Sequence, residues 1–214
     1  VKKMSKRLII VTNSKSNLLS FRGQLIKKLV NENFQVLVII PKSDFSIEFQ
    51  NKVLKLGAQT STVPLDRAGM NPFYDIMTFL SLKSIFKKFK PNVILSYTSK
   101  PIIYSGLAIG KNSKIKFYPN LTGLGYGFTE EFRINRKFIN FIMKILYKLS
   151  LQFSSVVIFQ NPDDQLLFSN LNITKEKKTF VVNGSGVDLN YYSPQTLPSN
   201  SIFLMLSRLV ADKG

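Results

Sequence analysis

Short apolar runs alternate with longer segments of helical periodicity along the chain, and this alternation limits its fold more than any other feature. Apolar runs bounded by turn residues are typical of buried strands, and segments with apolar residues three or four apart are typical of helices. Strands that alternate with helices form parallel sheets with helices on both faces. The chain is therefore predicted to adopt a Rossmann-like α/β fold.

The boundaries of the predicted elements follow from residues that begin or end helices and strands. Pro41 ends the second apolar run, Ser46 and Gly57 suit the two ends of a helix, and Pro72 suits the first turn of the next. Ser20 is expected to cap the first helix. We expect strands at 8–12, 35–40, 60–63, 92–96, 116–118, 156–159 and 179–182, and helices at 20–31, 46–56, 72–88, 101–109, 133–153 and 162–171.

A stretch rich in Pro, Ser and Asn, residues 193–200, predicts a linker between two domains. Residues 1–192 would form the first domain, and residues 201–214 the incomplete start of the second. The apolar residues 202–206 are expected to form a short buried strand. Arg208 and Lys213 follow at its carboxyl end, where ligands of α/β sheets bind, and a guanidinium together with an ammonium suits a diphosphate.

The chain of 214 residues contains neither Cys nor His. This composition excludes disulfides, Cys/His metal sites, Cys nucleophiles and Ser-His-Asp triads from these residues. A catalytic base would have to be a carboxylate, a Lys or a Tyr, or lie outside them. No signal-peptide core and no apolar run of about 18 residues is present, so no membrane span is predicted.

The net charge of +18 calls for an anionic partner. Nucleic acid, anionic lipid and phosphorylated substrates are the candidates, and a compositional bias towards Lys and Asn is the alternative explanation. No helix-turn-helix, RRM aromatic motif or OB pattern is visible, and the Lys residues are dispersed, which does not favour a nucleic-acid-binding protein.

Two polar turns follow predicted strands. The first is the loop from Asn13 to Ser20, which contains Ser14, Ser16 and Asn17 near a helix N-terminus. It suits a phosphate or sugar hydroxyls, although an ordinary polar turn explains the pattern equally well. The second places Asp66 beside Arg67 as a candidate sugar ligand or base; such an adjacent pair is more often a solvated ion pair or a cap.

A glycine-rich loop and a basic helix are two further candidates. Residues 122–127 read Thr-Gly-Leu-Gly-Tyr-Gly and permit close approach of the backbone to a ligand, beside the strand end at 97–101, but no Walker loop is formed. In the predicted helix 133–153, Lys137, Lys144 and Lys148 share a face that Arg136 and Arg133 extend. Such a face binds an anionic membrane; a core helix with a solvated Lys face is the alternative.

Several stretches in a fixed order resemble family 4 glycosyltransferases of the GT-B fold, in their N-terminal half. They are Phe21-Arg22 with Leu25-Ile26-Lys27, Val63 to Pro72, Tyr97-Thr98 with Lys100-Pro101, Asn120 to Tyr126, Phe159 to Asp164, Gly184 to Asp188, and Ser207-Arg208-Leu209 to Gly214. The nearest resemblance is to enzymes that extend polyprenyl-diphosphate-linked sugars. It covers nearly the whole chain.

The resemblance implies roles for individual residues. Arg208 and Lys213 match the family's Arg-x4-Lys, which neutralises the diphosphate of a nucleotide-sugar donor. The donor side would include Ser14, Ser16, Asn17, Gly186 and Asp188, and the acceptor side would include Arg22, Thr98, Lys100, Asn120, Thr122 and Gly123. The family often has a His after the fifth strand, which this chain lacks, so that role is absent or belongs to Asn120, Thr122 or Asp66; Asp66 is therefore a further catalytic candidate. Arg136, Lys137, Lys144 and Lys148 would face the membrane. The family's Glu-x7-Glu motif would lie beyond Gly214.

The resemblance therefore implies a retaining glycosyltransferase that moves a sugar from a nucleotide diphosphate, UDP rather than GDP, to a polyprenyl-diphosphate-linked glycan in capsule, lipopolysaccharide or N-glycan assembly. No metal or other cofactor is expected. Its partners would be the nucleotide sugar, the lipid-linked acceptor and the anionic inner face of the cytoplasmic membrane, and not nucleic acid. These 214 residues alone would be inactive, since the donor needs both domains. A non-catalytic nucleotide- or sugar-binding module remains the main alternative, ahead of a basic nucleic-acid-binding protein.

Overall fold

A computed structural model describes residues 6–67, 69, 71–111, 114–123, 134–174, 177–189 and 192–205, with the backbone alone at 17 and 134–137. Strands and helices alternate along these residues as the sequence predicts. The elements are β1 Arg7–Val11, α1 Lys15–Asn31, β2 Gln35–Pro41, the 3-10 turn η1 Lys42–Asp44, α2 Ile47–Lys55, β3 Gln59–Val63, α3 Pro72–Phe89, β4 Val93–Tyr97, α4 Ser99–Ile109, β5 Lys116–Leu121, α5 Ile134–Leu151, β6 Val157–Phe159, α6 Pro162–Asn170 and β7 Thr179–Val181.

The described strands form one parallel sheet of seven strands in the order β3-β2-β1-β4-β5-β6-β7. The chain builds outward from β1 through β2 to β3 and then returns to place β4 on the other side of β1. The order of the strands therefore reverses between β1 and β4. In open α/β sheets a ligand binds at such a reversal, outside the carboxyl ends of the strands.

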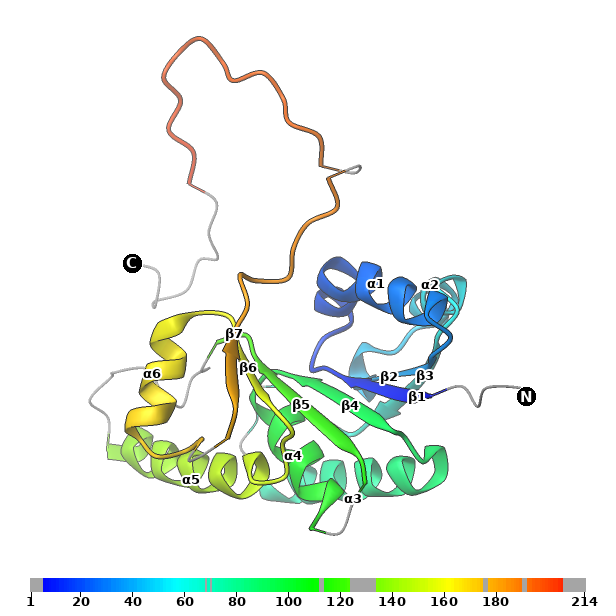
Figure 1. Ribbon diagram of the computed structural model, residues 1–214, viewed down its shortest axis with the longest axis vertical. Coiled ribbons are helices and arrows are strands. Elements are labelled where there is room, and N and C mark those ends of the chain that lie inside the picture. Colours follow the sequence, from blue (N-terminus) through cyan, green and yellow to red (C-terminus); the bar gives the residue numbers. More distant parts are fainter. Residues whose placement is uncertain are drawn as a thin grey trace.

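Helices cover both faces of the sheet, and each face has its own core (Figure 1). Leu8 and Ile10 of β1 point towards α1 and α2, whereas Ile9 and Val11 point towards the helices of the other face. This alternation is the two-residue period of a strand, and all four side chains are at most 3% exposed. The expected Rossmann-like sheet with helices on both faces is confirmed.

The first helix begins earlier than its sequence predicts. It starts at Lys15 with Ser14 at the N-cap, and not near Ser20. Leu18 is fully buried, so this turn already belongs to the apolar face of α1. The backbone N–H of Lys15 donates to Asp44 Oδ2 at 2.8 Å, which satisfies one of the free donors of the first turn. The predicted cap at Ser20 is therefore wrong.

Other predicted boundaries agree with the structure. Ser46 accepts a hydrogen bond from the backbone N–H of Phe49 and caps α2, and Gly57 follows the end of that helix with a φ of +81°. Pro72 lies in the first turn of α3, where its missing N–H costs nothing.

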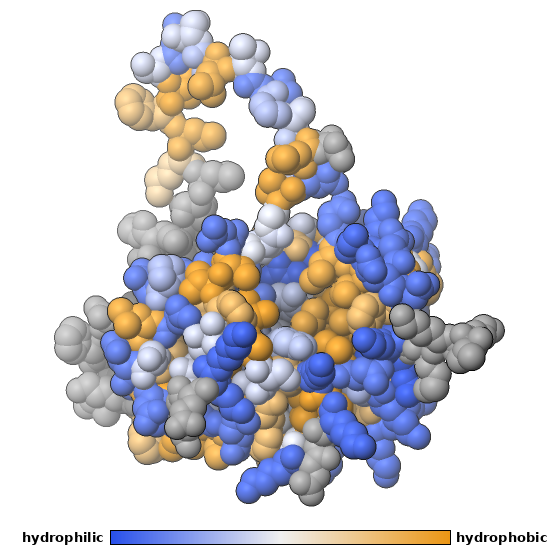
Figure 2. Space-filling view, in the orientation of Figure 1, coloured by the Kyte–Doolittle hydropathy of each residue, from blue (hydrophilic) through white to orange (hydrophobic). Residues whose placement is uncertain are grey.

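Beyond β7, the segment 192–205 lies in no helix or strand and extends away from the sheet (Figure 1). Its apolar side chains are exposed, and Phe203 is 99% exposed. Figure 2 shows these hydrophobic side chains in orange on the extended segment. The buried strand predicted at 202–206 is thus not formed at 202–205, because no neighbouring strand among the described residues pairs with it.

Candidate functional site

A cleft of about 620 Å³ lies at the carboxyl edge of the sheet, where the strand order reverses. It receives residues from the ends of five strands and from α1. These residues are Thr12 after β1, Tyr97 and Thr98 at β4, Thr122 after β5, Gln160 after β6, Phe21 and Arg22 of α1, and the segment 183–187 after β7. The volume is in the range of small-molecule sites. The cleft therefore has the position and the size of a ligand site.

Arg22 is the buried cation of this cleft. Its guanidinium carbon lies 4.1 Å from the centre of the Tyr97 ring, and the residue is 8% exposed. Nη1 donates to the Phe21 carbonyl at 3.0 Å and to the Ser185 hydroxyl. Desolvation by burial lowers the pKa of Arg22, and burial raises the pKa of Tyr97, which the nearby guanidinium opposes.

Among the described residues, Arg22 forms no ion pair with a carboxylate. A desolvated cation held by neutral groups is stabilised when an anion binds, since the charge then regains a partner. Arg22 is thus well placed for a phosphate or another anionic group. Its predicted place at the ligand site agrees with this geometry.

Thr98 has an unusual backbone conformation at the end of β4. Its φ of 70° and ψ of 163° fall in a region that glycine favours, and its hydroxyl donates to the Tyr97 carbonyl. Such a conformation costs roughly 1–3 kcal/mol and occurs most often at functional sites. Thr98 lines the cleft and is also the N-cap of α4, so its backbone sets the angle at which α4 leaves the sheet.

Two asparagines at strand ends have buried side-chain oxygens with no hydrogen-bond partner in the described part of the chain. They are Asn13, after β1, and Asn120, which pairs in register with Tyr97 on the neighbouring strand. Buried polar groups are nearly always hydrogen-bonded, so these amides are available to a ligand or to water. Asn120 is a predicted site residue, and Asn13 belongs to the polar turn after the first strand that the sequence offers as a candidate ligand site.

The predicted phosphate-binding turn after β1 is largely occupied by contacts within the chain. Ser14 is 3% exposed, and its hydroxyl lies 2.9 Å from that of Ser16. The first backbone N–H of α1 donates to the carboxylate of Asp44. The side chain of Asn17 lies outside the described residues. The donor role of these three residues stays a prediction.

The segment after β7 borders the cleft and contacts α1. Gly184 and Gly186 have φ values of +74° and +73°, and Asp188 Oδ2 accepts a hydrogen bond from Gln24 Nε2 at 2.7 Å. Gln160 Nε2 lies 3.4 Å from the Ser185 hydroxyl. Gly186 thus lies at the cleft as predicted, while Asp188 is bonded to a helix at its rim.

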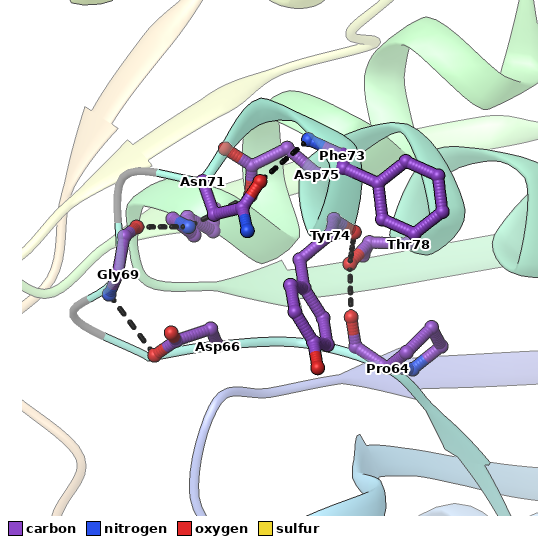
Figure 3. A network of polar contacts seen from close by, with 9 residues as sticks. Pro64, Asp66, Gly69, Asn71, Phe73, Tyr74, Asp75 and Thr78 are labelled. Carbon is purple, nitrogen blue, oxygen red and sulfur yellow. Dashed lines mark hydrogen bonds and ion pairs between the residues drawn. The ribbon is translucent and has the colours of Figure 1, made fainter.

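A separate polar network joins Asp66, in the loop between β3 and α3, through Gly69 to Lys100 of α4; Figure 3 shows the loop side of this network. Asp66 Oδ1 accepts the backbone N–H of Gly69 at 3.0 Å, and Lys100 Nζ donates to the Gly69 carbonyl at 2.6 Å and to Asp75 Oδ1 at 2.7 Å. The Lys100 and Asp75 side chains are only 18% and 19% exposed. Asp66 therefore shapes its own loop, and Lys100 joins this loop to α4.

The remaining predicted residues divide between two places. Thr122 lines the cleft, and Gly123 follows it with a φ of +141°. Lys144 and Lys148 are partly exposed on α5, which also exposes apolar residues such as Phe138 and Phe141. The alternative prediction, that the apolar face of this helix packs into the core, is therefore wrong for Phe138 and Phe141. Arg208, Lys213, the rest of the glycine-rich loop and the side chains of Arg136 and Lys137 lie outside the described residues.

The family model for glycosyl transferase 4-like proteins matches residues 9–161 of the chain. The chain belongs to this family. The match extends from β1 to the residues after β6, so it includes most of the strands that supply the cleft. The expected resemblance to family 4 glycosyltransferases is confirmed.

One curated relative of this glycosyl transferase 4-like chain is the N,N'-diacetylbacillosaminyl-diphospho-undecaprenol alpha-1,3-N-acetylgalactosaminyltransferase of Campylobacter jejuni. The two are 28% identical over 209 residues, which are 97% of this chain and 54% of the relative. The chain thus spans about half the length of the curated relative that it matches.

Solved structures with the same fold include a glycosyltransferase from Rickettsia africae, with a TM-score of 0.55 at 19% identity over 92% of this chain and 47% of that one. A UDP-GlcNAc 2-epimerase from Methanocaldococcus jannaschii has a TM-score of 0.51 at 14% identity over 83% and 45%. At these identities the likeness concerns the fold alone. Within the described part of the chain, no helix has the length and hydropathy needed to span a membrane.

Proposed function

We propose that this chain is the acceptor-side part of a glycosyltransferase that moves a sugar from a nucleotide diphosphate to a polyprenyl-diphosphate-linked glycan. The observation that carries the proposal is the cleft at the strand reversal, with the desolvated Arg22 beside strained Thr98, in a chain of the glycosyl transferase 4-like family. The relative from Campylobacter jejuni, named for a diphospho-undecaprenol acceptor, supports the class of acceptor.

In this proposal the acceptor lies against the cleft side of the sheet. Arg22 would contact an anionic or hydroxyl group of the acceptor, while the amide of Asn120 and the hydroxyl of Thr122 would orient its sugar. Arg208 and Lys213 would neutralise the charge that develops on the departing diphosphate, which is a preorganised electrostatic role. The donor would be UDP-linked, and these two side chains would do the work that a metal ion does elsewhere, so no cofactor is needed.

Retention of the sugar's configuration belongs to the same proposal. In that mechanism the bond to the departing diphosphate breaks on the face at which the acceptor oxygen attacks. The departing phosphate oxygen then receives the acceptor's hydroxyl proton. No side chain has to act as a nucleophile, which suits a site without His or Cys.

Transfer of labelled sugar to lipid tests the proposal. The natural full-length protein is incubated with membrane lipid extract and a panel of labelled UDP- and GDP-sugars, and label in the organic phase is counted. Transfer from one UDP-sugar, undiminished by EDTA and lost in Arg208→Ala and Lys213→Ala, is the expected result. NMR of the product gives its anomeric configuration. A folded protein that transfers no sugar from any donor would contradict the proposal and favour a binding module.

Arg22→Met provides a sharper test of the cleft. We expect at least a tenfold loss of kcat/KM, because a hydrogen bond to a charged group contributes about 1.5–3 kcal/mol. Arg7→Met is the matched control, since Arg7 is the first residue of β1 and lies at the amino ends of the strands, away from the cleft. This variant should retain wild-type transfer. Equal losses in both variants would show that overall charge, and not the cleft, explains the effect.

A further inference from the structure

Three helices on one face of the sheet, α3, α4 and α5, enclose an apolar groove of about 680 Å³. α4 packs against both of its neighbours. It contributes Ile103 and Tyr104, which are 1% and 9% exposed. The other two helices add partly exposed apolar side chains such as Ile76 and Ile142. None of the cleft residues described above lies in this groove.

One end of the groove is polar and lies next to the cleft. Lys100, Asp75 and Gly69 line the groove, and Lys100 is in the first turn of α4, two residues after Thr98. Figure 3 shows Gly69 on the loop before α3 and Asp75 in the first turn of that helix. The hydrogen bonds to Asp75 and Gly69 engage two of the three N–H donors of the Lys100 ammonium. The site thus has an apolar body and a polar end, where the ammonium of Lys100 is paired with the Asp75 carboxylate and keeps one N–H donor, and this end adjoins the transfer cleft.

The lining of the groove includes exposed apolar side chains from two helices. On α3, Ile76 is 57% exposed, and on α5, Ile142 is 38% exposed. Contiguous apolar surface of this kind marks a binding site for a protein, a membrane or a ligand. The groove is concave and has buried residues from α4 along it, which suits a single chain better than the flat surface of a bilayer.

We propose that this groove binds the isoprenoid chain of the lipid-linked acceptor, with the acceptor's diphosphate at the Lys100 end. The inference rests on the proposed function and adds the place of the acceptor's apolar part. Three features support this occupant: the apolar lining, the position of its polar end beside the cleft, and the N-terminus of α4 at that end, whose partial positive charge favours a phosphate and whose N-cap Thr98 makes no side-chain cap hydrogen bond.

Binding of a labelled probe tests the groove without any transfer reaction. The natural full-length protein is titrated with radiolabelled geranylgeranyl diphosphate, which has an isoprenoid chain and a diphosphate but no sugar. We expect Ile142→Gln to raise its Kd roughly tenfold, because an apolar side chain then no longer covers the bound chain. Ile145→Gln is the matched control on the same helix: the two isoleucines are 38% and 40% exposed, but only Ile142 lines the groove. It should change Kd less than twofold.

Transfer kinetics then separate this inference from the proposed function. The KM of Ile142→Gln should rise for a full-length polyprenyl acceptor and stay unchanged for an acceptor with two isoprene units, with kcat unchanged for both. Binding of the probe without any transfer would contradict the proposed function and leave the groove supported. Transfer by a protein that does not bind the probe would overturn the proposal that the groove binds the isoprenoid chain. Another segment or a second copy of the protein would then cover the groove. Equal effects of both glutamine variants would also overturn it, in favour of a flat membrane contact.

Discussion

At Thr98 the chain keeps a β-branched residue in a conformation that glycine adopts at lower cost. Replacing Thr98 by Gly should therefore stabilise the fold. We expect a gain of about 1 kcal/mol in the free energy of unfolding, which is the strain of roughly 1–3 kcal/mol less the entropy that a glycine loses on folding. The midpoint of urea unfolding measures it. Thr98→Ala keeps its Cβ and should show no gain; a stabilised alanine variant would contradict the strain.

The same substitution should reduce transfer. Thr98 determines how β4 passes into α4, and a glycine allows several directions where the threonine holds one. A variant that is more stable but slower would show that the strain serves the site. Equal or higher kcat/KM in Thr98→Gly would show that it does not.

The carboxyl of Asp164 should contribute to the pH dependence of stability. Burial raises its pKa above the ordinary value of 3.8, the neighbouring Asp163 adds to the effect, and the hydrogen bond with Asn161 opposes it. The folded protein thus holds this proton more tightly than the unfolded chain does. Stability falls as pH rises from the unfolded pKa through the folded pKa, and it stays lower at neutral pH.

Asp164→Asn should therefore raise the Tm at pH 7. It should leave the Tm unchanged at about pH 3, where the Asp164 carboxyl is protonated in the folded and in the unfolded state. The gain should stay below about 1 kcal/mol, because the residue is partly exposed and solvent screens its charge. Thermal unfolding at the two pH values measures the difference. Asp163→Asn removes the same charge from an exposed neighbour, and a matching gain there would attribute the effect to net charge.

Between elements, the closest approach of two helices depends on a glycine. A Cβ on Gly106 of α4 would lie 2.1 Å from the Ser150 hydroxyl oxygen and 2.7 Å from its carbonyl oxygen on α5. Gly106→Ala should destabilise the fold by about 1–3 kcal/mol, because α4 and α5 must separate. Urea unfolding measures the change. Adding Ser150→Ala removes only the hydroxyl contact and should restore part of the loss.

Gly23 in α1 is the control for this prediction. A Cβ there meets no atom within 4 Å, so Gly23→Ala should stabilise the fold by about 0.5–1 kcal/mol through helix propensity alone. Similar changes in the two variants would show that propensity, and not packing, decides both.

The sequence alone predicts most of the sheet because strands such as β1 and β2 are buried on both faces and read as continuous apolar runs. The start of α1 could not be placed so well. Ser14 and Ser20 are both suitable caps, and the choice depends on Asp44, which bonds the first turn from a distant turn of the chain. The predicted strand at 202–206 has the right composition, but a strand also needs a partner for its hydrogen bonds.

The candidate site shows the same division. The loops at the carboxyl edge could be predicted from chain order and topology. The contact of Arg22 with Tyr97 and with Ser185, which is 163 residues away, depends on the fold. Arg22 was expected from a family resemblance, and Asn13 was part of a candidate turn whose pattern does not show that its side-chain oxygen is buried. Periodicity shows where a side chain lies along an element, but not which distant group it meets.

For the molecule as a whole, the distribution of its charge matters more than the value of +18. The groove lies on the face that α3, α4 and α5 cover, while α1 and α2 cover the other face (Figure 1). If the protein binds an anionic membrane through the first face, Lys144 and Lys148 of α5 lie near the lipid headgroups. Each basic residue near such a surface contributes about 1 kcal/mol.

Lys144→Gln combined with Lys148→Gln should therefore weaken binding to vesicles of mixed neutral and anionic lipid by roughly thirtyfold, since about 2 kcal/mol is lost. Cosedimentation of the natural full-length protein measures it, and added salt should weaken wild-type binding in the same way. Lys27→Gln combined with Lys55→Gln removes the same charge from α1 and α2. If the protein meets the membrane in one orientation, this pair should change binding less than threefold. Equal losses in the two pairs would mean that the whole basic surface acts together, and the oriented contact would have to be abandoned.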